Sequence, residues 1–387
     1  MKIPIFQNKT ALSLLISSYI LILIGLILIY NASALTSLRD FGDQSFLLKK
    51  QLISMILGSV FLLFFSLLNH RTLIHFAKIF YFMSLVLLAS LFLPGVADSI
   101  YGARRWINIA GQQFQPSEVA KLSVIIFLAH WLGSTKIPKK IYFNSINANF
   151  ILILTPVIGL ILFEPDLKSA IIIAATAITI YYVSGAVKMR LLFSLIPLFI
   201  ISVILLIFTQ SYRIDRLKTF IDPTADTQNT SYHINQILIA LGNGGWFGVG
   251  LGQSRQKFEF IPEITTDSIF AIAAEELGFV GAVSIIALLW FLISNCFAIA
   301  RSSKDPVSRL LATGITTSLS LQVIINLASM VSLLPLTGIP LPFLSYGGTS
   351  LIMSMTSIGI LINIANNQTN QIMPPRVARI RNKKWRK

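Results

Sequence analysis

Residues 11–30 read ALSLLISSYILILIGLILIY and contain no charged side chain. A run of about 20 apolar residues is the length that a helix needs to cross the hydrocarbon core of a bilayer. The composition of the whole chain points the same way, because 55% of its 387 residues are hydrophobic and only 12% are charged. A typical soluble domain carries about 25% charged residues. The sequence therefore predicts a polytopic membrane protein without a separate soluble catalytic domain.

Hydrophobic runs bounded by turn and charge signals predict an all-α fold of about ten transmembrane helices. The expected spans are 11–30, 50–68, 76–93, 117–133, 149–163, 169–187, 191–208, 268–300, 308–334 and 349–366. This divides the chain into a cytoplasmic N-terminus (1–10), helices 1–7 (11–208), a long extracytoplasmic loop (209–267), helices 8–10 (268–366) and a basic cytoplasmic tail (367–387). The long loop contains apolar residues that could pack on the bilayer surface or on the helices.

The net charge of +16 would suggest nucleic-acid binding if the protein were soluble. In the predicted topology, however, the cytoplasmic segments carry 19 of the 31 basic residues and a single acid, Asp305. This asymmetry follows the positive-inside rule for a protein with both termini in the cytoplasm. The charge is therefore a topology signal, and we expect contact with membrane lipid and no nucleic-acid partner.

Two further features of the sequence concern cleavage of the first helix and the chemistry open to cysteine. Ala32-Ser33-Ala34 matches a signal-peptidase site, but the apolar run before it exceeds the usual core of about 7–15 residues. We therefore expect an uncleaved first helix. The single cysteine, Cys296, lies in an apolar stretch, which excludes a disulfide framework and a cysteine-based metal site.

Ionisable side chains at membrane depth cost about 2.5–3.5 kcal/mol each, so those that are retained are functional candidates. Glu118 and Lys121 are three residues apart and share one face of the fourth span, where a self-neutralising pair is the structural alternative. Arg104 and Arg105 stand beside Trp106, and the group could anchor the membrane interface or hold a phosphate.

Two aspartates stand where predicted helices begin. Pro165 disfavours helix for Glu164, so Asp166 is expected at a break, where it could cap the sixth span or belong to a site. Asp267 stands at the first turn of the eighth span, where N-capping is the alternative to a site role. Two glutamates inside that span, Glu275 and Glu276, need partners.

Two segments are rich in helix breakers. Residues 334–350 contain three prolines and three glycines with hydroxyl side chains such as Ser345, which predicts a broken or re-entrant segment that is buried in protein or lines a cavity, with a tight connection as the alternative. Residues 242–252 contain six glycines, but no Gly-Lys-Ser/Thr follows, so backbone anchoring or loop flexibility is favoured over phosphate binding.

Taken together, these motifs make the chain resemble the SEDS family (shape, elongation, division, sporulation), the FtsW and RodA group, and it is closer to FtsW. The resemblance covers nearly the whole chain. It rests on Ile29-Tyr30-Asn31-Ala32-Ser33, Gly102 to Ile107, Gln115-Pro116-Ser117-Glu118 with Lys121, Glu164-Pro165-Asp166-Leu167, Ile261 to Asp267 with Ala274-Glu275-Glu276-Leu277-Gly278, and Pro340-Leu341-Pro342-Phe343 through Ser345-Tyr346-Gly347-Gly348.

The resemblance implies a ten-helix peptidoglycan glycosyltransferase that polymerises lipid II at the outer face of the bacterial cytoplasmic membrane. It implies a class B penicillin-binding protein as transpeptidase partner, beside other membrane proteins of division or elongation. It also implies that Asp267 is catalytic and that Glu118, Lys121 and Asp166 join it around a polar cavity. The chain departs from the family at Thr265, where histidine is usual, at Ser268, where phenylalanine is usual, and at Lys168, where glycine is usual.

A sugar linked to lipid through diphosphate already carries a good leaving group, so its transfer requires a general base and cations at the phosphates more than a second acid. Our hypothesis makes Asp267 the base. The candidate substrate-binding residues are Glu118, Lys121, Asp166, Arg104, Arg105, Trp106, Arg255, Lys257 and Ser345. Mg²⁺ or Mn²⁺ could assist, since Glu118 and Asp166 offer hard oxygen ligands.

Three other functions compete with this hypothesis. A lipid II flippase or transporter would use a translocation path formed by the buried residues Glu118, Lys121, Asp166, Glu275 and Glu276. Such a protein should spread charges through the depth of the membrane, whereas Asp267, Asp166 and Glu118 are all expected near outer helix ends. A glycosidase could pair Glu263 with Asp267, but a hydrolase of finished glycan needs no ten spans. A scaffold could use the basic tail from Arg376 to Lys387 to bind anionic lipid or a cytoplasmic partner.

Overall fold

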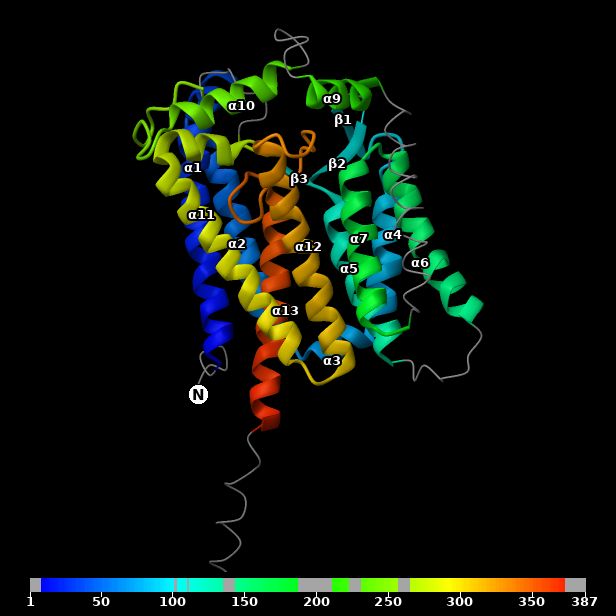
Figure 1. Cartoon of the computed structure of the whole chain (residues 1–387). Helices are drawn as coiled ribbons and strands as arrows, with labels where there is room; N and C mark the ends of the chain where they lie inside the picture. Colours follow the sequence, from blue (N-terminus) through cyan, green and yellow to red (C-terminus); the bar gives the residue numbers. More distant parts are fainter. Residues whose placement is uncertain are drawn as a thin grey trace, which may run out of the picture.

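The computed structural model describes residues 8–100, 103–109, 111–134, 143–186, 211–222, 231–256 and 265–372. These ranges form a helical bundle with a layer of shorter elements across one end (Figure 1). The longer helices are α1 (Lys9–Phe41), α2 (Phe46–Leu67), α5 (Pro116–Ser134), α6 (Phe143–Phe163), α11 (Ile269–Ser302), α12 (Pro306–Met330) and α13 (Gly348–Ile372). The shorter ones are α3 (His70–His75), α4 (Ala77–Ser90), α7 (Leu167–Val183), α9 (Ser211–Ile221) and α10 (Tyr232–Asn243).

Six of the described helices are long and apolar enough to cross a membrane, namely α1, α2, α6, α11, α12 and α13. Helices α4 and α7 are also apolar but shorter. The chain is therefore a multi-pass membrane protein, as its composition predicts. The expected span at 191–208 and the basic residues of the tail lie outside the described residues.

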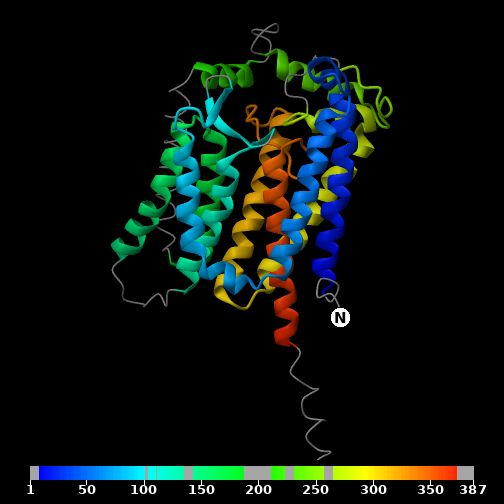
Figure 2. The ribbon, with the colours of Figure 1, turned by 180° about the vertical axis from the view of Figure 1, so that it is seen from behind.

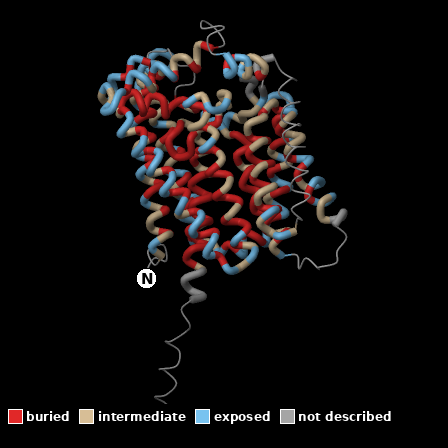
Figure 3. The backbone as a smooth tube through the Cα atoms, viewed as in Figure 1, coloured by how far each residue is buried: buried red, intermediate tan, exposed pale blue. Residues whose placement is uncertain are grey.

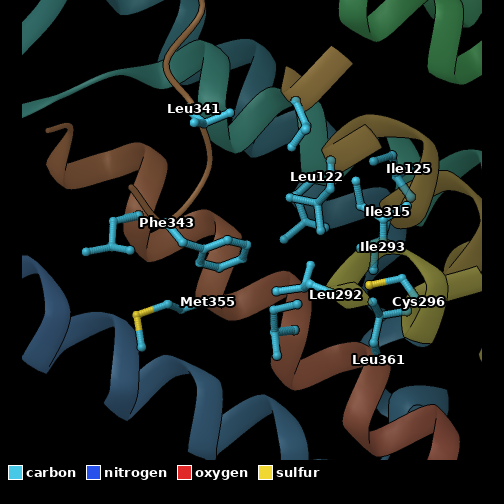
Figure 4. Close-up of a cluster of buried hydrophobic side chains, with 14 of the residues drawn as sticks. Leu122, Ile125, Leu292, Ile293, Cys296, Ile315, Leu341, Phe343, Met355 and Leu361 are labelled. Atoms are coloured by element: carbon cyan, nitrogen blue, oxygen red, sulfur yellow. The ribbon is translucent and has the colours of Figure 1, made fainter. Parts of the chain in front are cut away.

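Helix α13 lies at the centre of the bundle, where the buried positions concentrate (Figure 3). All of its residues from 354 to 366 are buried, and α2 packs along its length. Helices α1 and α11 lie on one side of this centre, and α4, α5, α6 and α7 lie on the other (Figure 1). Figure 4 shows the apolar core that joins α5, α11, α12 and α13, with Leu122, Ile125, Leu292, Ile293, Cys296, Ile315, Met355 and Leu361 among its side chains.

A three-stranded antiparallel sheet interrupts the helical pattern between α4 and α5. Its strands β1 (Ala97–Ile100), β2 (Ala103–Ile109) and β3 (Gln112–Phe114) pair in the order β1-β2-β3. Gly111 turns the chain between β2 and β3 with φ 80°, and its N–H donates to Asn108 Oδ1 at 3.0 Å. The sheet lies at the same end of the bundle as α9 (Figure 2). The prediction of an all-α fold was wrong here, because a short meander closed by such a turn leaves no hydrophobic signal of its own.

The predicted loop at 209–267 contains α9 and α10, and α10 packs against α11. Helix α11 is broken at Gly278, which has φ 70° and ψ −170°. The segment 244–252 supplies the missing hydrogen bonds, with Val249 N–H donating to Glu275 O at 3.0 Å and Gly250 N–H to Glu276 O at 3.1 Å. This close approach requires glycine and confirms the backbone-anchoring interpretation of the glycine-rich segment.

The close contact between α2 and α13 depends on Gly359. A Cβ at this position would lie 2.4 Å from the carbonyl oxygen of Leu62 on α2, a distance that requires the helices to separate. We expect Gly359→Ala to destabilise the protein by about 1–3 kcal/mol, the usual cost of overpacking. The measurement is thermal unfolding of the purified protein in detergent.

Gly159 on α6 provides the matched control, because a Cβ there meets no atom within 4 Å. We expect Gly159→Ala to unfold at or slightly above the wild-type temperature, since alanine favours helix. Equal unfolding temperatures for the two variants would contradict the assigned contact.

Candidate active site

Two breaks between helices meet at the end of the bundle that carries the sheet. One is Glu164-Pro165-Asp166 between α6 and α7, where Pro165 has φ 28°. The other is the segment 331–347 between α12 and α13, drawn in orange in Figure 1. Lys168 joins them, because its Nζ donates to Gly338 O at 2.6 Å. The prediction that residues 334–350 form a broken segment is therefore confirmed.

A cavity of about 410 Å³ lies between the two breaks. This volume is in the range of small-molecule sites in proteins. Its lining residues are Arg105, Pro165, Asp166, Leu167, Lys168, Ile171, Arg213, Arg216, Leu217, Ile325, Leu334, Pro335, Leu336, Thr337 and Gly338. Four of these are cations and one is an acid, so the lining favours an anionic ligand that also carries apolar groups.

Asp166 is buried, and both of its carboxylate oxygens accept hydrogen bonds from the protein. Its Oδ2 accepts hydrogen bonds from Gln115 Nε2 at 3.1 Å, Ser117 Oγ at 3.2 Å and Ser169 Oγ at 2.7 Å, and its Oδ1 accepts from Ser169 N–H at 3.3 Å. Burial opposes ionisation, but nearby cations, Lys168 first, and the Ser169 bonds outweigh it and hold the pKa of Asp166 below its ordinary value. The sequence left a helix cap and a site role open for Asp166; the structure shows that it caps α7 and that it also lines the cavity.

Asp267 has the opposite environment, although it is only 4% exposed. Its Oδ1 receives long hydrogen bonds from Thr266 Oγ1 at 3.4 Å and Ser268 Oγ at 3.5 Å, whereas its Oδ2 receives none from the described residues. Ser268 occupies the N-cap position of α11, so Asp267 is not the helix cap. The side chain of Asn326 holds the main chain here by donating to Asp267 O at 2.8 Å and to Ile339 O at 2.7 Å.

Asp267 is not among the residues that line the cavity, but its Oδ2 lies close to Gly338, which is. A Cβ on Gly338 would lie 3.7 Å from Asp267 Oδ2, 3.8 Å from Lys168 Nζ and 4.0 Å from Arg216 Nη1. These three charged groups therefore surround one point. Burial raises the pKa of Asp267, and the positive charges of Lys168 and Arg216 oppose that rise.

Glu118 and Lys121 form the ion pair that their spacing predicts, with Lys121 Nζ 2.7 Å from Glu118 Oε1. Both side chains are buried, and they line a separate cavity of about 20 Å³ between α5, α12 and α13. Neither residue lines the larger cavity. Since Glu118 and Asp166 already hold protein donors, a Mg²⁺ or Mn²⁺ ion would have to displace Lys121 or a hydroxyl group.

The predicted residues of the sheet have different positions relative to the cavity. Arg105 lies on its wall and binds the first break, with Nε donating to Glu164 O at 3.0 Å and Nη2 to Pro165 O at 2.7 Å. Arg104 is exposed and Trp106 is half-buried on β2, and neither lines the cavity.

Three further predicted residues do not line the cavity or cannot be placed. The side chain of Arg255 is exposed, and its main-chain N–H donates to Glu275 Oε1 at 3.4 Å. Ser345 is buried in a turn, where its Oγ accepts from Leu341 N–H at 2.8 Å. Lys257 lies outside the described residues. The two glutamates of α11 have partners, with Ser254 Oγ donating to Glu275 and Asn31 Nδ2 donating to Glu276 at 3.4 Å.

Three cavity cations were not among the predicted site residues. Arg213 and Arg216 lie on α9, where Arg213 Nη2 donates to Pro165 O at 3.3 Å and Arg216 Nη1 donates to Leu336 O at 3.0 Å. The third is Lys168. The sequence SYRIDRLKTFI at 211–221 alternates basic and apolar residues at helical spacing, a signal that could have identified α9 within the long loop.

Glu164 is buried beside the first break, and neither of its carboxylate oxygens has a hydrogen-bond partner in the described structure. Burial, reinforced by the charge of Asp166 and opposed by Arg105, raises the pKa of Glu164 from 4.5 to about 9. The folded protein thus retains a proton that the unfolded chain releases above pH 4.5. This contribution to stability is fully present below pH 4.5 and is lost as the pH rises to about 9.

We therefore expect Glu164→Gln, which keeps a neutral side chain of the same shape, to reduce the loss of stability as the pH rises. The unfolding temperatures of wild type and variant should diverge as the pH rises from 4.5 to about 9, with the variant the more stable at the alkaline end. Thermal unfolding across this range measures the difference. A temperature difference independent of pH would show that Glu164 is not protonated in the folded protein.

Comparison with known proteins identifies relatives over almost the whole chain. The family model described as cell cycle protein, covering FtsW, RodA and SpoVE, matches residues 11–370. The probable peptidoglycan glycosyltransferase FtsW of Trichlorobacter lovleyi is 34% identical over 350 residues, which cover 88% of this chain and 89% of the relative. Stage V sporulation protein E of Bacillus subtilis is 36% identical over 367 residues, which cover 93% and 98%.

Two solved structures also align with this chain over nearly its whole length. A chain from a peptidoglycan synthase complex, whose structure concerns the coordination of polymerization and crosslinking, aligns with a TM-score of 0.75 and 27% identity, covering 94% of this chain and 99% of that one. The rod shape determining protein RodA of Thermus thermophilus aligns with a TM-score of 0.68 and 26% identity, covering 94% and 98%. The chain belongs to the FtsW/RodA/SpoVE family of cell cycle proteins.

Proposed function

We propose that this protein is a peptidoglycan glycosyltransferase that polymerises lipid II into glycan strands, with Asp267 as the general base. The observation that carries the proposal is the position of Asp267 Oδ2, 3.7 Å from the Cβ position of Gly338, which lines a cavity with four cations and one acid. The names of the FtsW relatives support the activity. We propose a role in division, as the FtsW names of these relatives suggest, with the elongation role of RodA as the alternative.

We propose that the protein crosses the bacterial cytoplasmic membrane ten times, with both termini in the cytoplasm and the 209–267 segment outside. In this topology the cavity opens at the outer face of the membrane. The distribution of basic residues supports it, because 19 of 31 fall on the cytoplasmic side. Helices α9 and α10, which belong to the 209–267 segment, lie at the cavity end of the bundle in Figure 1.

In the proposed reaction, an acceptor sugar hydroxyl attacks the anomeric carbon of the lipid-linked donor. Asp267 Oδ2 takes the hydroxyl proton while the new glycosidic C–O bond forms. The bond between the anomeric carbon and the diphosphate oxygen breaks, and the polyprenyl diphosphate leaves with its electrons. Lys168, Arg213 and Arg216 stabilise the negative charge that grows on the diphosphate.

The distribution of charged groups favours a transferase over a flippase. The four cavity cations and Asp166 line one cavity, and Asp267 Oδ2 lies near Gly338 of the same cavity. Deeper in the bundle, Glu118 and Lys121 neutralise one another. At the opposite end, a buried network joins the elements, with His70 Nδ1 3.0 Å from Asn363 Oδ1 and His70 Nε2 3.0 Å from Ser308 Oγ.

The proposed partner is a class B penicillin-binding protein that cross-links the new strands. The structural relative that belongs to a peptidoglycan synthase complex supports this partnership. Other membrane proteins of division or elongation complete the proposed assembly. The proposal does not require a metal ion.

Asp267→Asn tests the role of the base, because it preserves the volume of the side chain and removes its basicity. We expect polymer formation from labelled lipid II, measured with the class B partner present, to fall by a factor of about 100 or more, as for loss of a general base. The unfolding temperature should remain close to that of wild type. Moenomycin in every assay suppresses unrelated polymerases.

Asp40→Asn is the matched control, since the side chain of Asp40 is 47% exposed and does not line the cavity. It should polymerise at the wild-type rate. Full activity of Asp267→Asn would refute the base assignment, and lipid II transfer across liposomes without any polymer would favour the flippase.

A further inference from the structure

Lys168 is the second residue of α7, and its half-buried side chain reaches the cavity wall. Its ammonium group donates one hydrogen bond within the described structure, to Gly338 O at 2.6 Å. The proposed reaction uses the charge of Lys168 at the diphosphate but gives no role to this hydrogen bond, which fixes where the charge lies.

The charge of Lys168 lies near two aspartates, Asp166 and Asp267, that differ in the hydrogen-bond donors available to them. Asp166 receives four hydrogen bonds from neutral donors, which already satisfy its two oxygens. From neighbouring side chains among the described residues, Asp267 receives two long bonds on Oδ1 and none on Oδ2. Since Asp267 has the weaker set of donors, it depends more on a nearby cation to remain ionised while buried.

The charged groups around Asp267 come from three neighbouring helices. Lys168 comes from α7 and Arg216 from α9, and both lie about as close to the Gly338 position as Asp267 Oδ2 does. His233 of α10 reaches Ser268, with its Nε2 2.9 Å from Ser268 Oγ. Helix α12 contributes the neutral Asn326, which binds the main-chain oxygen of Asp267.

Lys168 and Arg216 differ in exposure, and this difference makes Lys168 the stronger electrostatic influence on the Asp267 carboxyl. Arg216 is exposed, so water and salt screen its charge. Lys168 is half-buried and held by the Gly338 carbonyl, and a fixed charge in a less polar environment acts more strongly. Of the charges that oppose the effect of burial on the pKa of Asp267, that of Lys168 is the largest.

We propose that Lys168 is a positioning residue for the transfer reaction, whose ammonium group favours the ionised form of the buried Asp267 carboxyl and whose bond to Gly338 fixes the cavity wall beside Asp267 Oδ2. This inference rests on the proposed function for the role of Asp267 as base. The charge of Lys168 does not depend on that role, so the two can be tested separately.

The substitutions separate the charge from the tether. Lys168→Gln keeps an N–H donor for Gly338 O but removes the charge, Lys168→Met removes both, and Lys168→Arg keeps both. Lys218→Met on α9 is the control, because the side chain of Lys218 is 74% exposed. Each variant is made in the full-length protein, with and without Asp267→Asn.

The primary measurement is the titration of the Asp267 carboxyl by infrared spectroscopy, read from the carbonyl band that Asp267→Asn abolishes. We expect the midpoint to rise by about one pH unit or more in Lys168→Gln and Lys168→Met, the usual effect of removing a close opposite charge. Lys168→Arg and Lys218→Met should titrate like wild type. The pH at which polymerisation of lipid II falls on the acid side should shift by the same amount.

An unchanged midpoint in Lys168→Gln would overturn the proposal and leave Lys168 as a tether only. If Lys168→Met does not fold, the Gln and Arg variants still decide the question. If wild type makes no polymer at any pH, the proposed function fails, while the infrared midpoint still tests the effect of Lys168 on Asp267.

Discussion

Where a helix breaks inside an apolar bundle, backbone N–H and C=O groups lose their partners in the helix and need other hydrogen-bond partners. In this structure, side chains from other elements supply those partners. At the first break, Arg105 and Arg213 donate to the carbonyls of Glu164 and Pro165. At the second break, between α12 and α13, Asn326 and Lys168 do the same for Ile339 and Gly338. The cations that line the cavity therefore also hold the backbone that forms its wall, so the fold and the site cannot be separated.

This dual use explains how a membrane protein retains a cluster of cations. Each buried arginine or lysine would be costly without acceptors. The carbonyls of the two breaks provide those acceptors while the remaining donors of each side chain stay available. A helix without a break offers no such carbonyls, which explains why the breaks and the cations occur together.

Local spacing predicted the parts of the site that depend on local geometry. The interval between Glu118 and Lys121 predicted their ion pair, and Pro165 predicted the break that makes Asp166 a helix cap. The sheet at 97–114 and the cations of α9 could not be predicted in the same way. Their positions depend on contacts such as that of Arg213 with Pro165, 48 residues away along the chain. A periodicity read along one segment contains no information about such partners.

The site must satisfy two electrostatic requirements that conflict. A departing diphosphate needs cations, but a cation in direct contact with the base would reduce its affinity for a proton. Within the described residues, Asp267 forms no ion pair. Lys168 and Arg216 lie near the Gly338 position without bonding to Asp267, and Lys168 bonds to Gly338 O instead. This spacing leaves Asp267 Oδ2 able to accept a proton. Glycine at 338 is part of the arrangement, because any side chain there would occupy the space between the base and the cations.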